Sequence, residues 1–204
     1  MNDKKIQTII FDLGGVVFTD GTSETIAFLC QKYNLPYEKV DEFFNGQWGS
    51  FYRTGKIDIY SFWNRIRSEF HINENVDSLA NTWHSFYMLQ DDVFQIINEL
   101  KTQKYELLFL SDNVKERVNY LQKRYHFLNW FDDGIFSFTV GMRKTDYRIF
   151  ELILKKTNTP ARNCIYIDNV EKFNQIARTL NFNTILFKDG YLLKESFKTF
   201  GITI

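Results

Sequence analysis

The stretch Ile6-Gln7-Thr8-Ile9-Ile10-Phe11-Asp12-Leu13-Gly14-Gly15 decides the fold. Its apolar run, Ile6–Phe11, is too short for a helix and ends at a carboxylate and two glycines, which is typical of a buried parallel strand followed by a tight turn. Later runs of the same form predict three more buried strands, at Tyr105–Leu110, Cys164–Ile167 and Thr184–Phe187.

Helical patterns alternate with these strands. Apolar residues recur at helical spacing over 93–100, 114–121, 149–153 and 176–180. An alternation of strands and helices predicts an α/β fold with a mainly parallel sheet. The short run Ile135–Phe138 is interpreted either as a further strand or as an irregular edge.

The segment 18–89 breaks this alternation and shows only helical periods, so we expect it to form a separate helical layer. Pro36 fits a first helical turn and Asp58 fits an N-cap within this segment. Its many aromatic side chains favour a packed core over a cofactor site.

The composition excludes several classes of partner. Twenty-five basic residues balance twenty-five acidic ones, so no net field attracts nucleic acid or an anionic membrane. No run approaches the roughly twenty apolar residues that span a bilayer, and the apolar run before Asp12 is too short for a signal peptide. Cys30 and Cys164 lie far apart on apolar faces, which favours reduced thiols and a cytoplasmic location.

Polar residues follow three of the predicted strands directly, at Asp12, Ser111 and Asp168. In open α/β sheets ligands bind at this carboxyl edge, although each residue alone also fits an ordinary turn or N-cap. Gly14 and Gly15 would let the backbone approach a phosphate. Asp12 and Asp168 would repel each other unless a cation lay between them, and oxygen ligands of this kind suit Mg²⁺.

Lys144 precedes a predicted helix and is a candidate for the same edge, although a solvated surface lysine is its ordinary interpretation. Together the candidates form one ordered series of motifs: FDLGGVV at 11–17, LFLSD at 108–112, GMRKTDYRIF at 141–150 and YIDN at 166–169. This series resembles the four motifs of the haloacid dehalogenase superfamily.

The resemblance covers essentially the whole chain. It implies a Rossmann-like core formed by residues 1–17 and 90–204, with residues 18–89 inserted as a helical cap. The stretch Phe51–Trp63 looks like the cap of the branch that contains glucose-1-phosphatase and the N-terminal phosphatase domain of soluble epoxide hydrolase.

Matched by motif position, the resemblance implies a role for each candidate. Asp12 would be the nucleophile that forms an aspartyl-phosphate, with Lys144 as its catalytic partner. The phosphate would be bound by Ser111, Asp112, Lys144, Gly14 and Gly15. Mg²⁺ would be held by Asp12, Gly14, Asp168 and Asn169. The implied partner is a small phosphorylated substrate, bound by a monomer or homodimer.

The chain departs from the family pattern at several positions. Gly14 stands where most of these phosphatases carry a second aspartate that transfers protons, and Asn169 stands where many carry another acid. Asp112 replaces a common asparagine and adds a negative charge unless it pairs with Lys144 or Arg143. Thr145 replaces a common proline. Because general acid–base catalysis contributes about 10²–10⁴-fold, the loss at Gly14 predicts a slow enzyme or a good leaving group.

Three functions are therefore compatible with the sequence. The first is a Mg²⁺-dependent phosphatase of a small metabolite. The second is a catalytically weakened relative that works as a binding or regulatory module, which Gly14, Asp112 and Asn169 would explain. The third is a 2-haloacid dehalogenase, which Asp168 makes less suitable. Phosphate-ester turnover with Mg²⁺ would identify the phosphatase. Binding without turnover would identify the module, and release of halide from a 2-haloacid would identify the dehalogenase.

Overall fold

The computed structural model describes residues 6–204. The strands are β1 (Thr8–Phe11), β2 (Glu106–Ser111), β3 (Asp133–Phe136), β4 (Cys164–Asp168) and β5 (Asn183–Leu186). The helices before β2 are α1 (Gly21–Tyr33), α2 (Tyr37–Asn45), α3 (Gln47–Arg53), α4 (Ile59–Phe70), α5 (Val76–Ser85) and α6 (Asp91–Thr102). The later helices are α7 (Lys115–Tyr125), α8 (Ser137–Val140), α9 (Arg148–Leu154), α10 (Glu171–Thr179) and α11 (Gly190–Thr199), with short 3-10 turns at Phe127–Trp130 and Ala161–Asn163.

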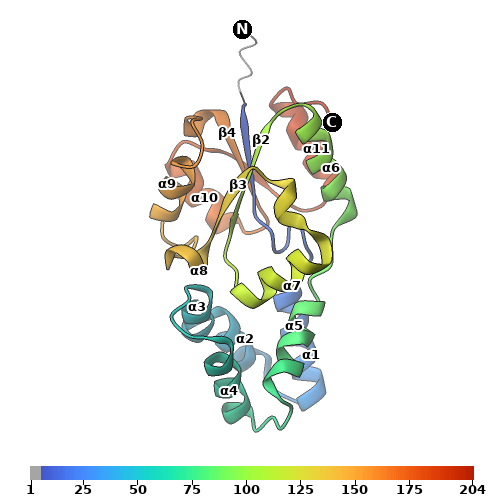
Figure 1. Ribbon diagram of the computed structural model, residues 1–204, viewed down its shortest axis with the longest axis vertical. Coiled ribbons are helices and arrows are strands. Elements are labelled where there is room, and N and C mark those ends of the chain that lie inside the picture. The colour runs from blue at the N-terminus through green and yellow to red at the C-terminus, as the bar shows by residue number, and fades with distance from the viewer. Residues whose placement is uncertain (1–5) are drawn as a thin grey trace.

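The strands form one sheet in the order β3-β2-β1-β4-β5, and every neighbouring pair is parallel (Figure 1). The predicted α/β fold with a parallel sheet is therefore confirmed. The run 135–138 divides between two elements, because β3 ends at Phe136 and α8 begins at Ser137. β1 is central, so the chain reverses its strand order beside it. Ligands bind at such a switch point in open α/β sheets.

The sheet is buried on both faces because its strands are apolar at successive positions. Ile9 and Phe11 point into one cluster of buried side chains, and Ile10 points into the other. Helices α6 and α11 supply side chains to the first cluster, whereas α9 and α10 cover the opposite face (Figure 1). This double cover fixes which edge of the sheet remains open for a ligand.

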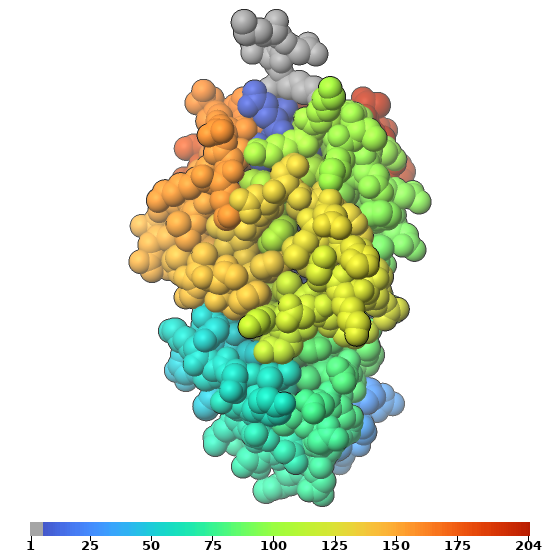
Figure 2. All heavy atoms as spheres, in the orientation of Figure 1, coloured from blue at the N-terminus to red at the C-terminus, as the bar shows by residue number. Residues whose placement is uncertain are grey.

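Helices α1 to α5 form a second layer beyond the carboxyl edge of the sheet (Figure 1). Phe44, Phe62, Trp63 and Trp83 are fully buried there, with edge-to-face contacts among their rings. The aromatic residues therefore pack as a core, as the sequence favours. Figure 2 shows the cyan and green surface of this layer lying against the yellow surface of the sheet layer.

Two chain segments connect the layers and pair with each other. Thr19 N donates to Met88 O at 2.9 Å, and Gln90 N donates to Val17 O at 3.0 Å. A single bridge between Phe18 and Leu89 lies between these bonds. The backbone therefore leaves and re-enters the sheet layer at one place, close to the residues where the sequence changes its pattern.

Local signals in the helical layer gave mixed results. Asp58 caps α4 as expected, because its Oδ1 accepts from Ser61 N at 2.7 Å. Pro36 is the N-cap residue of α2 rather than part of its first turn.

Both cysteines are free thiols. Within residues 6–204, none of the helices is both long enough and apolar enough to cross a bilayer.

The buried His84 on α5 predicts a sensitivity to acid. Burial, with a smaller contribution from Arg117, lowers the pKa of His84 to about 3, and its Nε2 has no hydrogen-bond partner among residues 6–204. Below about pH 6.5 the unfolded chain therefore binds a proton that the folded chain rejects, and the free energy of unfolding falls as the pH falls. We expect His84→Gln to gain about 1–2 kcal/mol relative to the wild type between pH 6.5 and 5, measured by urea unfolding.

A matched control is His71→Asn, because His71 is exposed at the left-handed end of α4. Its unfolding free energy should follow the wild-type pH profile. A His84→Gln profile parallel to that of the wild type would contradict the assignment.

Candidate active site

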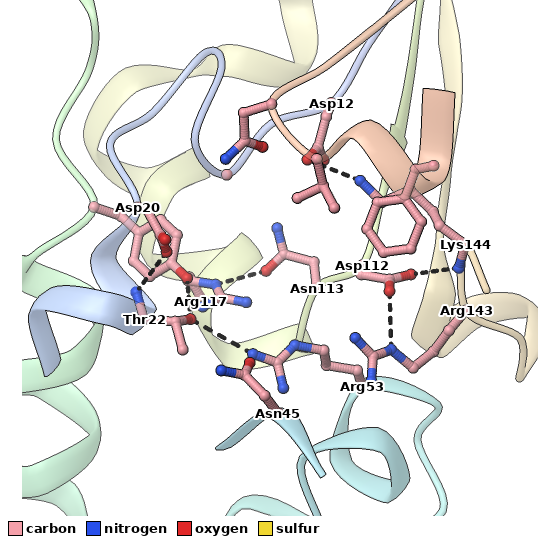
Figure 3. Close-up of a pocket in the computed structure, with 15 residues that line it drawn as sticks. Asp12, Asp20, Thr22, Asn45, Arg53, Asp112, Asn113, Arg117, Arg143 and Lys144 are labelled. Carbon is pink, nitrogen blue, oxygen red and sulfur yellow. Dashed lines mark hydrogen bonds and ion pairs between the residues drawn. The ribbon is translucent and has the colours of Figure 1, made fainter. Parts of the chain in front are cut away.

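A pocket of about 160 Å³ opens at the carboxyl edge of the sheet, between the two layers (Figure 3). The sheet layer and the segments that leave it contribute Asp12, Gly14, Asp20, Tyr87, Asp112, Asn113, Arg117, Arg143, Lys144, Asn169, Val170 and Phe173. The helical layer contributes Thr22, Asn45 and Arg53. Such a small, polar and strongly charged cavity suits a small charged ligand.

Asp12 lies at the end of the central strand, where β1 delivers it directly to the pocket. Its backbone N donates to Ile167 O at 2.9 Å, which continues the pairing of β1 with β4. Its Oδ1 accepts from Leu13 N at 2.7 Å. The side chain is only 8% exposed, so the carboxylate is held in one orientation at the pocket wall.

Lys144 joins the two predicted carboxylates. Its Nζ lies 2.8 Å from Asp12 Oδ2 and 2.6 Å from Asp168 Oδ2, and the three side chains are almost completely buried. Sequence reasoning required a cation between Asp12 and Asp168. The structure places the Lys144 ammonium in that position, so their mutual repulsion is offset before any metal binds.

Burial and charge act in opposite directions on this triad. Burial raises the pKa of Asp12 to about 7, against the opposing attraction of Lys144. Burial favours the neutral form of Lys144 as well, but the charges of Asp12, Asp168 and Asp112 carry its pKa above the ordinary value. The lysine therefore stays charged at neutral pH, whereas burial makes the Asp12 carboxyl harder to ionise than an exposed aspartate.

Asp168 is fully buried and does not line the pocket. Its Oδ2 accepts from Lys144 Nζ and from the Tyr166 hydroxyl, and its Oδ1 accepts from Val170 N at 2.8 Å. Both oxygens are thus engaged by donors of the protein. The next residue, Asn169, does line the pocket.

Gly15 supports Asn169 instead of lining the pocket. It has φ of +84°, and a Cβ at this position would lie 2.4 Å from Asn169 Nδ2. A side chain is excluded here both by conformation and by space. The Gly15 amide donates to Phe18 O at 2.6 Å, so it is already used within the turn, whereas Gly14 faces the pocket.

The second strand contributes Ser111 and, just after it, Asp112. Ser111 is the last residue of β2 and is buried, and α7 is capped three residues later by Val114, so Ser111 is not an N-cap. Asp112 pairs with Arg143 Nε at 2.9 Å and accepts from Lys144 N at 3.0 Å. Asp112 therefore orients the loop that carries Lys144, and its charge is compensated.

Several lining residues were missed by the sequence analysis. Asn113 Oδ1 accepts from Arg117 Nε at 2.7 Å, and Asn113 Nδ2 donates to Ser111 Oγ at 3.4 Å. Arg53 and Thr22 come from the helical layer, whose side-chain arrangement has no signature in one sequence. Asn113 precedes the N-cap of α7 and Arg117 lies in its first turn, four residues later, and this spacing is the one signal that was available.

The oxygens that face the pocket fit a hard cation of the Mg²⁺ type. The described residues contain no cluster of three or more His, Cys, Asp or Glu side chains, which excludes a dedicated cage among them. Asp12 and the amide of Asn169 line the same pocket as the main chain of Gly14. One carboxylate with neutral oxygens is a donor set that Mg²⁺ accepts when water and a substrate phosphate complete it.

Comparisons with known proteins agree with this geometry. A family model described as haloacid dehalogenase-like hydrolase matches residues 6–170. An uncharacterised protein of Dictyostelium discoideum is 26% identical, over 94% of this chain and 95% of its own length.

Two solved structures show the same fold. A HAD family enzyme of Bacteroides thetaiotaomicron, solved as a magnesium complex, gives a TM-score of 0.78 at 20% identity, over 96% of this chain and 100% of its own. A HAD-like family hydrolase of Porphyromonas gingivalis gives 0.77 at 17% identity, over 96% and 97%.

The triad predicts a large cost for removing its cation. Lys144→Met should lower the free energy of unfolding by about 3–5 kcal/mol at pH 8, because two buried carboxylates then lose their partner. The loss should shrink as the pH falls, since protonation removes the unpaired charges. Urea unfolding at several pH values measures both effects.

The control is Lys156→Met, which breaks the partly exposed pair of Lys156 with Asp133 at 2.8 Å. Exposed pairs contribute little, so its effect should stay below about 1 kcal/mol. Equal effects of the two substitutions would show that the Lys144 triad is not a buried charge network.

Proposed function

The chain belongs to the haloacid dehalogenase-like hydrolases, and from that premise we propose that it is a Mg²⁺-dependent phosphatase of a small phosphorylated metabolite. The observation that carries the proposal is the buried Asp12 at the pocket wall, paired with Lys144 at 2.8 Å. A carboxylate held in one orientation beside a fixed cation is suited to attack an anionic centre. Another structure of the Bacteroides enzyme, a complex with magnesium and inorganic phosphate, supports this reaction class by analogy.

In the proposed reaction, an Asp12 oxygen forms a bond to phosphorus and the bond from phosphorus to the leaving oxygen breaks. Water then attacks the aspartyl-phosphate, which releases inorganic phosphate and restores the carboxylate. Lys144 offsets the repulsion between Asp12 and the phosphate. Lys144 is also assigned to the phosphoryl oxygens. Ser111, predicted for the same role, is 1% exposed and does not line the pocket, so we assign it to orienting the pocket residue Asn113, whose Nδ2 donates to Ser111 Oγ at 3.4 Å.

We assign the metal to Asp12, Asn169 and the carbonyl of Gly14, which all line the pocket. When bound there, Mg²⁺ would neutralise charge on the phosphoryl oxygens. Asp168 is assigned to holding Lys144, because it is fully buried and does not line the pocket, and its Oδ2 accepts from Lys144 Nζ. Helices α1 to α5, within residues 18–89, are assigned to a cap that supplies Thr22, Asn45 and Arg53 to the substrate.

Gly14 and Asn169 also favour a second candidate, a binding or regulatory module without turnover. Gly14 carries no group that transfers a proton, and an amide oxygen binds Mg²⁺ more weakly than a carboxylate. This candidate predicts that phosphate esters bind to the pocket without being hydrolysed.

The nucleophile is tested by Asp12→Asn. The purified wild type should hydrolyse an aryl phosphate only with Mg²⁺, and the variant should lose at least about 10³-fold in kcat, because the amide forms no aspartyl-phosphate. The control is Asp146→Asn, a change in the Arg148 pair outside the pocket, which should keep wild-type turnover. Turnover by Asp12→Asn would refute the nucleophile, and absence of turnover by the wild type would favour the binding module.

The missing proton donor is tested by leaving groups. With Gly14, an aryl phosphate should be a much better substrate than an alkyl phosphate, because the alkoxide needs a proton as it leaves. Gly14→Asp should raise kcat for the alkyl ester by about 10–10²-fold and leave the aryl ester nearly unchanged. The new Cβ would lie 3.3 Å from Tyr87 Cε1, so only a small shift of the ring is needed.

The control for this experiment is Gly14→Asn, which has the same size and transfers no proton. Proton transfer at position 14 does not limit the reaction if Gly14→Asp and Gly14→Asn change kcat by the same factor for the alkyl ester and for the aryl ester.

A further inference from the structure

The charges in the pocket are unevenly distributed. At one end, Lys144 is paired with Asp12 and Asp168, and nearby Arg143 is paired with Asp112. At the other end lie Arg53 from α3 and Arg117 from α7, and neither forms an ion pair with any of residues 6–204. Figure 3 shows both guanidinium groups across the pocket from Asp12.

Arg117 has a free donor although it is only 1% exposed. Its Nε donates to Asn113 Oδ1, but its Nη1 is buried without a hydrogen-bond partner in the described part of the chain. An unpaired donor on a buried cation costs free energy in the absence of a ligand. Arg117 also lines the pocket, so a ligand that accepts hydrogen bonds from its guanidinium there would offset this cost.

Aromatic rings hold the Arg117 guanidinium by its faces. Its central carbon lies 4.1 Å from the centre of the Tyr87 ring and 4.7 Å from that of Trp83. Stacking of this kind stabilises the cation and leaves the N–H edge for a planar anion. The stacking accounts for the position of the side chain but not for the unpaired Nη1.

Arg53 is held just as firmly by neutral groups. Its Nη1 donates to Phe44 O and Gly49 O, and its Nη2 lies 3.5 Å from Thr22 Oγ1. Burial, together with the charges of Arg143 and Arg117, lowers its pKa to about 10. The Arg53 and Arg117 guanidinium groups therefore repel each other at this end of the pocket, and among residues 6–204 neither is paired with a carboxylate, unlike Arg143.

We propose that Arg53 and Arg117 form a subsite for a second anionic group on the substrate, a carboxylate or a phosphate. The inference rests on the proposed phosphatase function and narrows its substrate to a small phosphate monoester that carries another negative group. The first group binds at Asp12 and Lys144, and the second pairs with the two arginines. Since Arg53 belongs to the helical layer and Arg117 to the sheet layer, the same anion bridges the layers.

Phosphonates test the subsite without turnover, because their carbon–phosphorus bond is not a phosphate ester. The probes are propylphosphonate, with one anionic group, 3-phosphonopropionate, with an added carboxylate, and propane-1,3-bisphosphonate, with an added phosphonate. Calorimetry at one fixed Mg²⁺ concentration gives each Kd. The wild type should bind at least one of the two-anion probes about ten-fold or more tightly than propylphosphonate. The tighter of the two then identifies the second group.

Arginine variants test whether the preference for two-anion probes over propylphosphonate comes from Arg53 and Arg117. Arg117→Gln and Arg53→Gln should each reduce it to about two-fold or less, because a neutral amide loses the charge-assisted hydrogen bonds. Arg117→Lys, which keeps the charge but loses the planar fork, should give an intermediate preference and covers the case in which Arg117→Gln fails to fold. The matched control is Arg124→Gln, an exposed arginine on the same helix α7, which should keep the wild-type preference.

Equal binding of the probes by the wild type would overturn the proposal, as would an unchanged preference in Arg53→Gln and Arg117→Gln. An equal loss in Arg124→Gln would also overturn it, because the effect would then come from overall charge. Failure of the phosphatase function is separate: a strong preference for two-anion probes without any Mg²⁺-dependent turnover would leave the subsite standing and refute the enzyme.

Discussion

The Lys144 ammonium, buried between Asp12 and Asp168, is the interaction on which the rest of the site depends. Two carboxylates at adjacent strand ends would repel each other strongly in a dry interior, and the sheet brings them together whether or not a ligand is present. Lys144 removes this conflict with contacts of 2.8 and 2.6 Å. The loop that carries it is in turn held by Asp112, which accepts from the Lys144 amide. Asp112, which departs from the asparagine common in the family motif, thus helps to position Lys144.

Much of the fold was predictable because buried parallel strands are short and apolar. The strand at residues 8–11 and its neighbours were located from such runs, and the parallel sheet followed from their alternation with helices. The run 135–138 was ambiguous because its second half begins α8. Composition does not show where the strand β3 changes to the helix α8, because Phe136 and Phe138 are compatible with both a strand and a helix.

The site was predictable only where sequence order fixes spatial order. Residues that directly follow a strand must meet at the carboxyl edge, so Asp12 and Ser111 could be placed from the sequence. The different surroundings of Asp168 and Asn169 could not, because successive residues at a strand end face opposite directions and the sequence does not say which faces the pocket. The position of Arg53 in the pocket could not be predicted, because it depends on how the two layers pack against each other.

The two layers share the pocket unequally, and this asymmetry has a physical consequence. The groups assigned to phosphoryl transfer stand on the rigid sheet, where strand pairing sets their positions within narrow limits. Arg53 stands on α3, and its position is set by the paired segments at 17–19 and 88–90 together with a direct contact between the layers, in which Ser137 Oγ donates to Arg53 O at 2.6 Å. An uncompensated cation on each layer opposes their close approach, whereas an anion between Arg53 and Arg117 attracts both.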